Sequence, residues 1–181
     1  PLLAWTIKTA LKAEFGPVVV SSDSEEIITV AKKHGASVPF KRSLEFAQDT
    51  SDVVSAVLEL VVFYEQQGNR YDAILLLQPT SPFRSVESIH RAIALFEHAG
   101  GESVISVSPA CVQPQWLKRI DELGGLQAYD ANFDASLQSQ QLPSLFQLNG
   151  LIYLSSVSNL KANRSFYSAN PKALEIRCGK E

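Results

Sequence analysis

Two kinds of hydrophobic pattern alternate along the chain. In some segments apolar side chains recur every three or four positions, which is typical of helices that bury one face. In others they form short continuous runs, which is typical of strands buried on both faces. The helical spacing covers residues 2–14, 22–34, 51–67 and 86–99, and the apolar runs cover residues 18–20, 37–40, 74–77, 103–107, 148–154 and 173–178.

Strands that alternate with helices predict βαβ units with right-handed crossovers. The sequence therefore predicts an α/β fold whose central sheet is mostly parallel and flanked by helices. The length of 181 residues suits a single domain over residues 1–181. Between Pro109 and Pro143 the periodicity fades, which indicates an excursion from the sheet.

Composition and charge narrow the function. The chain is 45% hydrophobic with a formal net charge of −3, so a basic groove for nucleic acid is not expected. No apolar run reaches the roughly 18 residues that span a bilayer. Cys111 and Cys178 are too far apart for a zinc or redox motif, and the three histidines fall in predicted helices without ligand spacing.

The most informative polar segment follows the apolar run 74–77, at the end of a strand where α/β sheets bind ligands. Its two prolines hold the backbone extended, Gln78 can donate and accept, and Thr80 and Ser81 add hydroxyls. Arg84 precedes a predicted helix N-terminus, which favours an anion. A carboxylate or phosphate on a sugar-like ligand would suit this group, although proline and serine also make ordinary turns and caps.

Two further clusters allow two interpretations each. Ser22 and Asp23 follow the apolar run 18–20 and could contact a ligand, but Ser22 also has capping-box spacing to Glu25. Arg42 lies in a polar loop and could be solvated surface. Asn149-Gly150 inside a predicted strand indicates either a bulge or a close approach of the backbone to a ligand.

Taken in order, these clusters resemble the acylneuraminate cytidylyltransferases, also called CMP-sialic acid synthetases. Most of the chain is covered, and the segment Leu-Leu-Gln-Pro-Thr-Ser-Pro-x-Arg is the most specific match. The matching stretches are Val18-Val-Val-Ser-Ser-Asp-Ser-Glu-Glu-Ile27, Ala31-Lys-Lys-His-Gly-Ala36, Asp49-Thr50, Leu76-Leu-Gln-Pro-Thr-Ser-Pro-Phe-Arg84, Gln141-Leu-Pro143 and Leu148-Asn-Gly-Leu-Ile-Tyr153.

The resemblance implies a Rossmann-like nucleotidyltransferase core and an excursion over residues 112–146 that makes a homodimer. It also implies transfer of CMP from CTP to a nine-carbon α-keto acid sugar with release of pyrophosphate, Mg²⁺ as cofactor, and a cytoplasmic location. Phosphoryl-type chemistry of this kind depends on positioning and electrostatics.

The resemblance also implies roles for individual residues. On the nucleotide side it places Ser22, Asp23 and Arg42. On the sugar side it places Gln78, Thr80, Ser81, Arg84, Lys118, Asn149, Tyr153, Phe166 and Tyr167, of which Phe166 and Tyr167 match an aromatic pair that the partner subunit supplies in the family. It implies no metal ligand within these residues.

The chain departs from the family at both ends and at two internal positions. The family's glycine- and lysine-containing phosphate loop would precede Pro1, and its Asp-x-Asp metal motif would follow Glu181, so we expect an incomplete chain that is inactive by itself. Ser139 and Gln147 stand where the family usually has arginine, which indicates a changed sugar preference. The alternatives are therefore a legionaminate-like sugar, 3-deoxy-octulosonate, or a binding protein without turnover.

Overall fold

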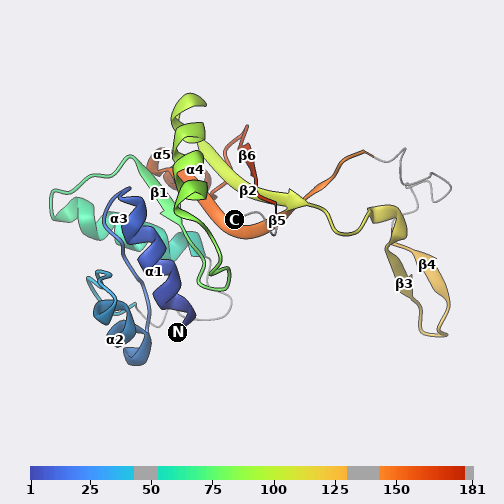
Figure 1. Cartoon of the computed structure of the whole chain (residues 1–181), viewed down its shortest axis with the longest axis horizontal. Helices are drawn as coiled ribbons and strands as arrows, with labels where there is room; N and C mark the ends of the chain where they lie inside the picture. The colour runs from blue at the N-terminus through green and yellow to red at the C-terminus, as the bar shows by residue number, and fades with distance from the viewer. Residues whose placement is uncertain (43–52, 130–142, 178–181) are drawn as a thin grey trace.

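The computed structural model of the chain describes residues 1–42, 53–129 and 143–177. Figure 1 shows a body in which helices surround a sheet, and an arm that projects from the body. The arm consists of residues 110–129 and 143–145 among those described. Predictions that concern Asp49-Thr50, Ser139 and Cys178 lie outside the described residues.

The body contains five helices and four paired strands within the described residues. The helices are α1 (Leu2–Ala13), α2 (Glu25–Lys33), α3 (Val53–Gln66), α4 (Val86–His98) and α5 (Val157–Asn163), and the strands are β1 (Ala73–Leu76), β2 (Ser103–Pro109), β5 (Phe146–Ser156) and β6 (Lys172–Glu175). The sheet has the order β1-β5-β2-β6.

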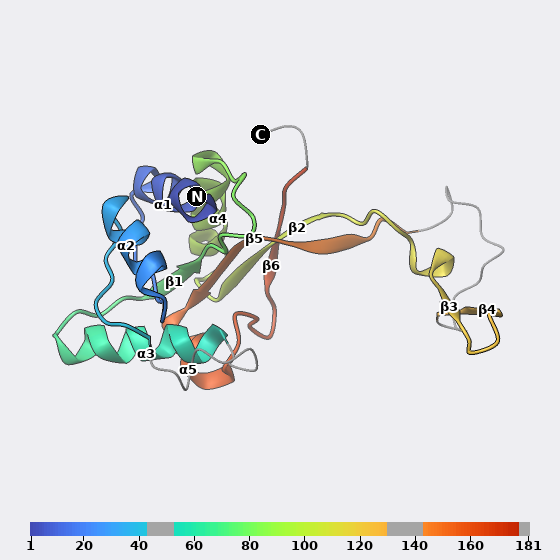
Figure 2. The ribbon, with the colours of Figure 1, turned by 90° about the horizontal axis from the view of Figure 1, so that it is seen from below.

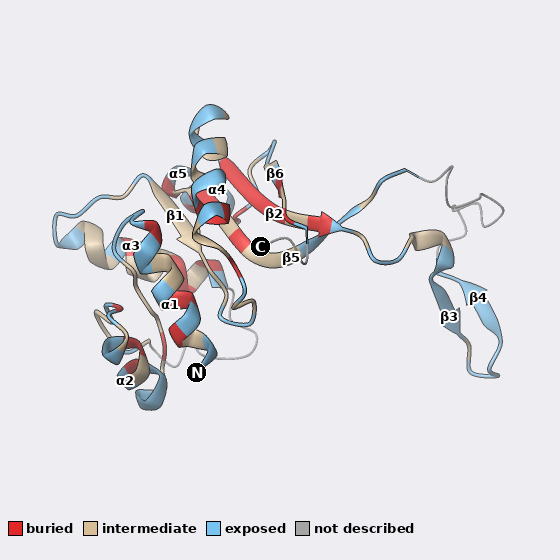
Figure 3. Cartoon of the chain, in the orientation of Figure 1, coloured by how far each residue is buried: buried red, intermediate tan, exposed pale blue. Residues whose placement is uncertain are grey.

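Helices cover both faces of this sheet, as Figure 2 shows. On one face, α1 and α4 pack against a cluster that includes Val104, Ile152 and Leu154, each fully buried. On the other face, Val54 and Val57 of α3 and Leu160 of α5 share a cluster with Ile105 of β2. Because neighbouring strand residues point to opposite faces, Val104 and Ile105 supply one core each. Figure 3 shows the buried positions concentrated along β2 and β5. The predicted three-layer α/β architecture is therefore present.

The direction of one strand changes the sheet from the predicted arrangement. β1, β2 and β6 run in one direction, as a mostly parallel sheet requires, but β5 lies between β1 and β2 and is antiparallel to both. The chain leaves the body after β2, enters the arm and returns as β5. A strand that returns beside its predecessor without a crossover must be antiparallel, so the sheet is mixed.

The first predicted βαβ unit, over residues 18–40, contains very little strand pairing. Val18–Val20 and the segment after Gly35 are extended, but they form only one parallel bridge, between Val19 and Ser37. Val20 N donates to Ser37 O at 2.9 Å, and Ser37 N donates to Val18 O at 2.8 Å. These extended residues and β1 border the same cavity, which is described below.

The predicted capping box at the start of α2 is wrong. The helix begins at Glu25, and Ser24, not Ser22, is the N-cap whose hydroxyl accepts from Ile27 N at 3.5 Å. Ser22 Oγ instead accepts from Ser24 N at 3.1 Å. Three serines within four positions offer the backbone nearly equivalent caps, so the local pattern did not decide between them.

A second difference is α5, a short helix that the sequence did not predict.

The arm contains little that could form a core. Its strands β3 (Lys118–Ile120) and β4 (Leu126–Ala128) form an antiparallel hairpin in which every residue is exposed. A 3₁₀ turn over Pro114–Trp116 precedes it. The described residues of the predicted excursion, 112–129 and 143–145, project from the body in Figure 1. Within the described ranges, no helix is both long and apolar enough to cross a membrane.

Candidate functional site

The proline segment, residues 78–84, connects β1 to α4 in the body. It begins with a turn in which Ser81 N donates to Gln78 O at 3.2 Å. It ends at Ser85, whose hydroxyl caps α4 by accepting from Ser88 N at 3.0 Å. Gln78 and Ser81 are half-buried and Thr80 is exposed, so the segment presents polar side chains at the end of a strand, as predicted.

Arg84 fixes this segment from inside the protein. Its guanidinium donates from Nη2 to Gln78 O at 2.6 Å, from Nε to Leu151 O at 2.9 Å, and from Nη1 to Thr6 Oγ1 at 3.2 Å. The residue is 4% exposed. Burial lowers the pKa of Arg84 to about 10, so the guanidinium remains protonated at neutral pH.

These bonds correct the prediction that Arg84 binds the ligand. An arginine just before a helix N-terminus seemed placed to receive an anion, but its donors point to protein oxygens on three separate segments. Arg84 therefore shapes the site without lining it. The resemblance also implied that Arg84 shapes this segment, but sequence spacing did not reveal its partners, because Thr6 and Leu151 are 78 and 67 positions away.

Opposite the proline segment, β5 departs from regular pairing. Ile105 of β2 pairs with Tyr153, whereas Val107 pairs with Leu148. Residues 149–152, which we call the β5 bulge, therefore face Ser106 alone. The bulge includes Gly150, whose φ of +71° is a backbone conformation that other residues adopt with strain. The interpretation of Asn149-Gly150 as a β-bulge, made from the sequence, is confirmed.

The β5 bulge and the proline segment meet. Ser81 Oγ donates to Asn149 O at 3.4 Å. A Cβ atom on Gly150 would lie 3.2 Å from Gln78 Oε1 and 3.3 Å from Ser81 Oγ. The backbone at Gly150 therefore closely approaches the proline segment, and its predicted approach to a ligand stays a prediction. The structure thus brings together Gln78, Ser81 and Asn149, which are up to 71 positions apart in the sequence.

The side chain of Asn149 is committed to the protein. Its Oδ1 accepts from Leu151 N at 3.1 Å and from Ser106 Oγ at 2.6 Å, and its Nδ2 donates to Ser108 Oγ at 3.0 Å. Asn149 therefore braces the β5 bulge against β2. The side chain thus supports the bulge, and its predicted contact with the sugar stays a prediction.

The predicted aromatic residues divide between core and surface. Phe166 is 4% exposed and belongs to the core between the sheet and α3, and its ring centroid lies 6.1 Å from that of the half-buried Tyr153. Phe166 is thus a packing residue in this chain. Tyr167 is exposed, and its pKa is raised by partial burial and by Tyr153. Within the chain, Tyr167 is therefore the more accessible of the predicted pair.

The predicted nucleotide residues form a second group. Arg42 Nη2 lies 3.6 Å from Asp23 Oδ1, and Arg42 N donates to Ser22 O at 2.9 Å. Ser22 is buried. Arg42 Nε and Ser21 Oγ are buried without a hydrogen-bond partner among the described residues. Ser21 belongs to the polar cluster that the sequence places after the apolar run 18–20, but the resemblance assigned the nucleotide role to Ser22, because neighbouring serines gave no signal to separate them.

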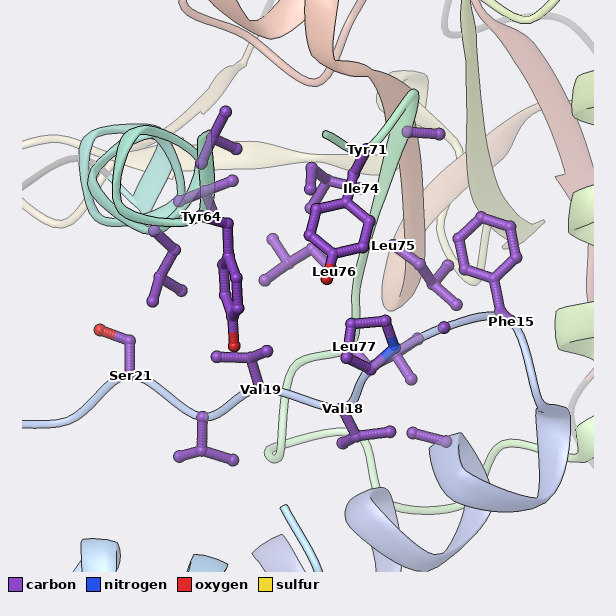
Figure 4. Close-up of a pocket in the computed structure, with 18 of the residues that line it drawn as sticks. Phe15, Val18, Val19, Ser21, Tyr64, Tyr71, Ile74, Leu75, Leu76 and Leu77 are labelled. Carbon is purple, nitrogen blue, oxygen red and sulfur yellow. The ribbon is translucent and has the colours of Figure 1, made fainter. Parts of the chain in front are cut away.

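Ser21 and Arg42 lie at one end of a cavity of about 720 Å³. Figure 4 shows that extended residues 18–21 border it on one side and β1 borders it on the other, with Tyr64 and Tyr71 between them. Much of the remaining lining is aliphatic and comes from α1 and α3, and the charged residues Arg70, Asp72 and Glu97 also line the cavity. The volume is typical of a small-molecule pocket. Among the described lining residues, Ser21 and Arg42 carry the buried polar atoms that have no hydrogen-bond partner.

Two predictions receive no support from the arrangement within one chain. Lys118 lies in the exposed hairpin of the arm, away from the proline segment in both Figure 1 and Figure 2. The residues described contain no group of three or more His, Cys, Asp or Glu that could hold a metal ion. The carboxylate at this site, Asp23, faces Arg42. The resemblance places the Mg²⁺ ligands outside these residues, so the expected cofactor stays a prediction.

Two solved structures share the fold. A CMP:2-keto-3-deoxy-manno-octonic acid synthetase complexed with CTP has a TM-score of 0.66 at 10% identity, covering 98% of this chain and 79% of that one. A 4-diphosphocytidyl-2C-methyl-D-erythritol synthase from Anaerococcus prevotii has a TM-score of 0.57 at 12% identity, covering 96% and 76%. The predicted Rossmann-like nucleotidyltransferase fold is confirmed.

Sequence comparison identifies the family. The profile described as "Cytidylyltransferase" matches residues 1–163, so the chain belongs to the cytidylyltransferase family and is a nucleotidyltransferase. It is 41% identical over 175 residues to the CMP-N,N'-diacetyllegionaminic acid synthase of Legionella pneumophila, covering 96% of this chain and 75% of that relative. It is 29% identical over 169 residues to the N-acylneuraminate cytidylyltransferase of Escherichia coli, covering 92% and 39%.

The contact between Gly150 and the proline segment leads to a stability prediction. Gly150→Ala adds backbone strain and crowds Gln78 and Ser81, so it should lower the free energy of unfolding by about 2–3 kcal/mol in urea denaturation. Gly68→Ala is the matched control, because Gly68 also has a positive φ of +82° but has nothing within 4 Å of its added Cβ. It should cost about 1–2 kcal/mol. Equal losses in the two variants would contradict the close approach.

Proposed function

We propose that this cytidylyltransferase transfers CMP from CTP to a nine-carbon α-keto acid sugar of the N-acylneuraminate type, releasing pyrophosphate. The observation that carries the proposal is the junction of the proline segment with the β5 bulge, at the end of β1. There the Gln78 side-chain amide has no hydrogen-bond partner among the described residues, so its donors and acceptor are free for a polyhydroxylated ligand. The relatives that act on such sugars support this choice.

Within this class, we favour a legionaminate-like acceptor. The 41% identical relative is named for CMP-N,N'-diacetyllegionaminic acid. Gln147 is uncharged and stands where the acylneuraminate cytidylyltransferases usually have arginine. It makes two contacts with Cys111: Cys111 N donates to Gln147 Oε1 at 3.3 Å, and Gln147 Nε2 lies 3.7 Å from Cys111 Sγ. The alternative acceptor 3-deoxy-octulosonate is supported only by a fold likeness at 10% identity.

In the proposed reaction, the anomeric hydroxyl of the sugar attacks the α-phosphorus of CTP in line. An O–P bond forms, the bond from the α-phosphorus to the bridging oxygen breaks, and pyrophosphate leaves with that electron pair while the hydroxyl proton is released. Gln78 and Ser81 would orient the sugar, and Ser21 and Arg42 would hold the nucleoside end. Such positioning lowers the barrier because both reactants are held before the reaction begins.

Mg²⁺ remains part of the proposal through the resemblance alone. No step above depends on it, because the described residues do not offer a set of ligands. A reaction that consumes CTP is expected in the cytoplasm, which is likewise an implication of the resemblance.

A pyrophosphate-release assay with the full-length enzyme tests the activity. With CTP, we expect release with N,N'-diacetyllegionaminate and slower release with N-acetylneuraminate, whereas 3-deoxy-octulosonate should give little. A preference for 3-deoxy-octulosonate would overturn the choice of sugar. No release with any acceptor would favour a binding protein without turnover.

Gln78 provides a test of the two half-sites. Gln78→Ala should raise KM for the sugar about tenfold, the effect of losing roughly one to two hydrogen bonds, and should change KM for CTP less than about twofold. Gln66→Ala, at an exposed glutamine in α3, is the control and should change neither value. A larger effect on CTP would show that the proline segment serves the nucleotide.

We also propose that the arm binds a second copy of this chain. Ile120 and Leu126 pair across the hairpin and are 75% and 74% exposed, and Leu123 at its turn is 97% exposed. An isolated two-stranded hairpin is marginally stable in water, so apolar side chains of this kind need a surface to cover them. A homodimer would also let Lys118 and Tyr167 approach a site on the partner subunit, as the resemblance implies.

Sedimentation equilibrium tests this assembly. The full-length protein should sediment with the mass of two chains. The double variant Ile120→Glu and Leu126→Glu should sediment as one chain, because buried carboxylates oppose association. Ile27→Glu is the control, since Ile27 is an exposed apolar residue of the body, and it should remain a dimer. A double variant that stays dimeric would place the interface elsewhere.

A further inference from the structure

We infer that Ser106 of β2 is a positioning residue, whose hydroxyl sets the shape of the β5 bulge and thereby the side of the acceptor site that faces Gln78. The inference rests on the proposed function for the identity of the acceptor. Ser106 touches neither the proline segment nor the cavity in any contact described above, so its effect passes through the bulge.

The β5 bulge needs such support because it has lost its regular pairing with β2. Four residues of β5 face one residue of β2, so the ordinary ladder cannot satisfy their backbone groups. Buried backbone groups without partners are costly, and here side chains supply the partners. Leu151 N donates to Asn149 Oδ1, and Leu151 O accepts from Arg84 Nε.

Ser106 of β2, which lies opposite the bulge, bonds to the backbone of Ile152 and to the side chain of Asn149. Its Oγ accepts from Ile152 N at 2.8 Å and lies 2.6 Å from Asn149 Oδ1 and 3.1 Å from Ile152 O. The single hydroxyl hydrogen has its shorter contact with Asn149 Oδ1. At 1% exposed, Ser106 cannot be replaced in this role by bulk water.

Ser108 fixes the orientation of the Asn149 amide. Its Oγ donates to Ile176 O at 2.6 Å, so it must accept from Asn149 Nδ2. Because Leu151 N can only donate, it must meet the carbonyl oxygen of the same amide. Both constraints leave Asn149 Oδ1 pointing to Ser106, and the network has one consistent assignment.

The path from Ser106 to the acceptor site is short. Asn149 O accepts from Ser81 Oγ, and Gly150 lies against the Gln78 amide. If the Ser106 hydroxyl is removed, Ile152 N loses its acceptor and Asn149 loses a donor. The bulge can then relax, and Gly150 moves relative to Gln78. The nucleotide group at Ser21 and Arg42 has no bond to this network in the structure and should be unaffected.

The test compares Ser106→Ala with Ser155→Ala in the full-length enzyme. Ser155 is a matched control, because it is also fully buried in this sheet and accepts a hydrogen bond, from Asn159 Nδ2 at 2.9 Å, but lies outside the bulge. Ser106→Ala should raise KM for the sugar about tenfold and leave KM for CTP within about twofold. Ser155→Ala should change neither. Equal effects on both substrates, or no effect on the sugar, would overturn the inference.

Hydrogen exchange separates this inference from the proposed function. Amides 151 and 152 should exchange at least about tenfold faster in Ser106→Ala than in the wild type, and unchanged exchange there would overturn the positioning role. An enzyme that releases no pyrophosphate with any acceptor would overturn the proposed function, while the exchange result would still decide the role of Ser106 in the bulge.

A second pair of variants covers the case in which Ser106→Ala does not fold. Ser106→Thr and Ser106→Val add the same volume at this position, but only threonine keeps the hydroxyl. The threonine variant should have the lower KM for the sugar and the slower exchange. Equal behaviour of the two would show that the hydroxyl has no positioning role.

Discussion

The buried guanidinium of Arg84 is the interaction on which the site depends. Placing a charge inside a protein is unfavourable unless its donors are satisfied, and here they bond to oxygens on α1, the proline segment and β5. A single planar group thus holds three segments that are far apart in the sequence. Hydrogen bonds from a charged donor contribute about 1.5–3 kcal/mol each. Removing the guanidinium would lose these contributions and would leave three oxygens without this donor.

This arrangement explains why the acceptor side of the site combines a rigid segment with an irregular strand. The prolines restrict residues 78–84, and the bulge brings the β5 backbone towards them where a regular strand would not reach. Glycine at position 150 lets the two approach, because any side chain would occupy the space beside Gln78 and Ser81. Irregular backbone of this kind is expected where a protein positions a ligand, and its support comes from buried serines and Asn149.

The two half-sites differ in their physical character. Among the described residues, the proposed acceptor side is a network in which Arg84, Asn149 and the buried serines have protein partners, whereas the Gln78 side chain has none. The proposed nucleotide side borders a cavity that is lined mostly by aliphatic residues, where Ser21 and Arg42 retain unpaired polar atoms. Polar groups that are hydrogen-bonded within the protein hold the shape of the site, and polar groups without such a partner are available to bind a ligand. This distinction, more than distance, separates Arg84 and Asn149 from Gln78, although all were expected to contact the sugar.

The sequence by itself determined four of the five described helices, most strands, and the segments that would form the site. These follow from local periodicity and from proline, glycine and strand-end chemistry, which act over a few residues. It also determined the family, because the proline segment and its flanking stretches are specific. Only the tertiary structure decided that β5 runs antiparallel, that Phe166 packs in the core, and that Arg84, Asn149 and Ser106 support the site. Most of those outcomes depend on partners more than about 40 positions away, and local pattern carries no information about such contacts.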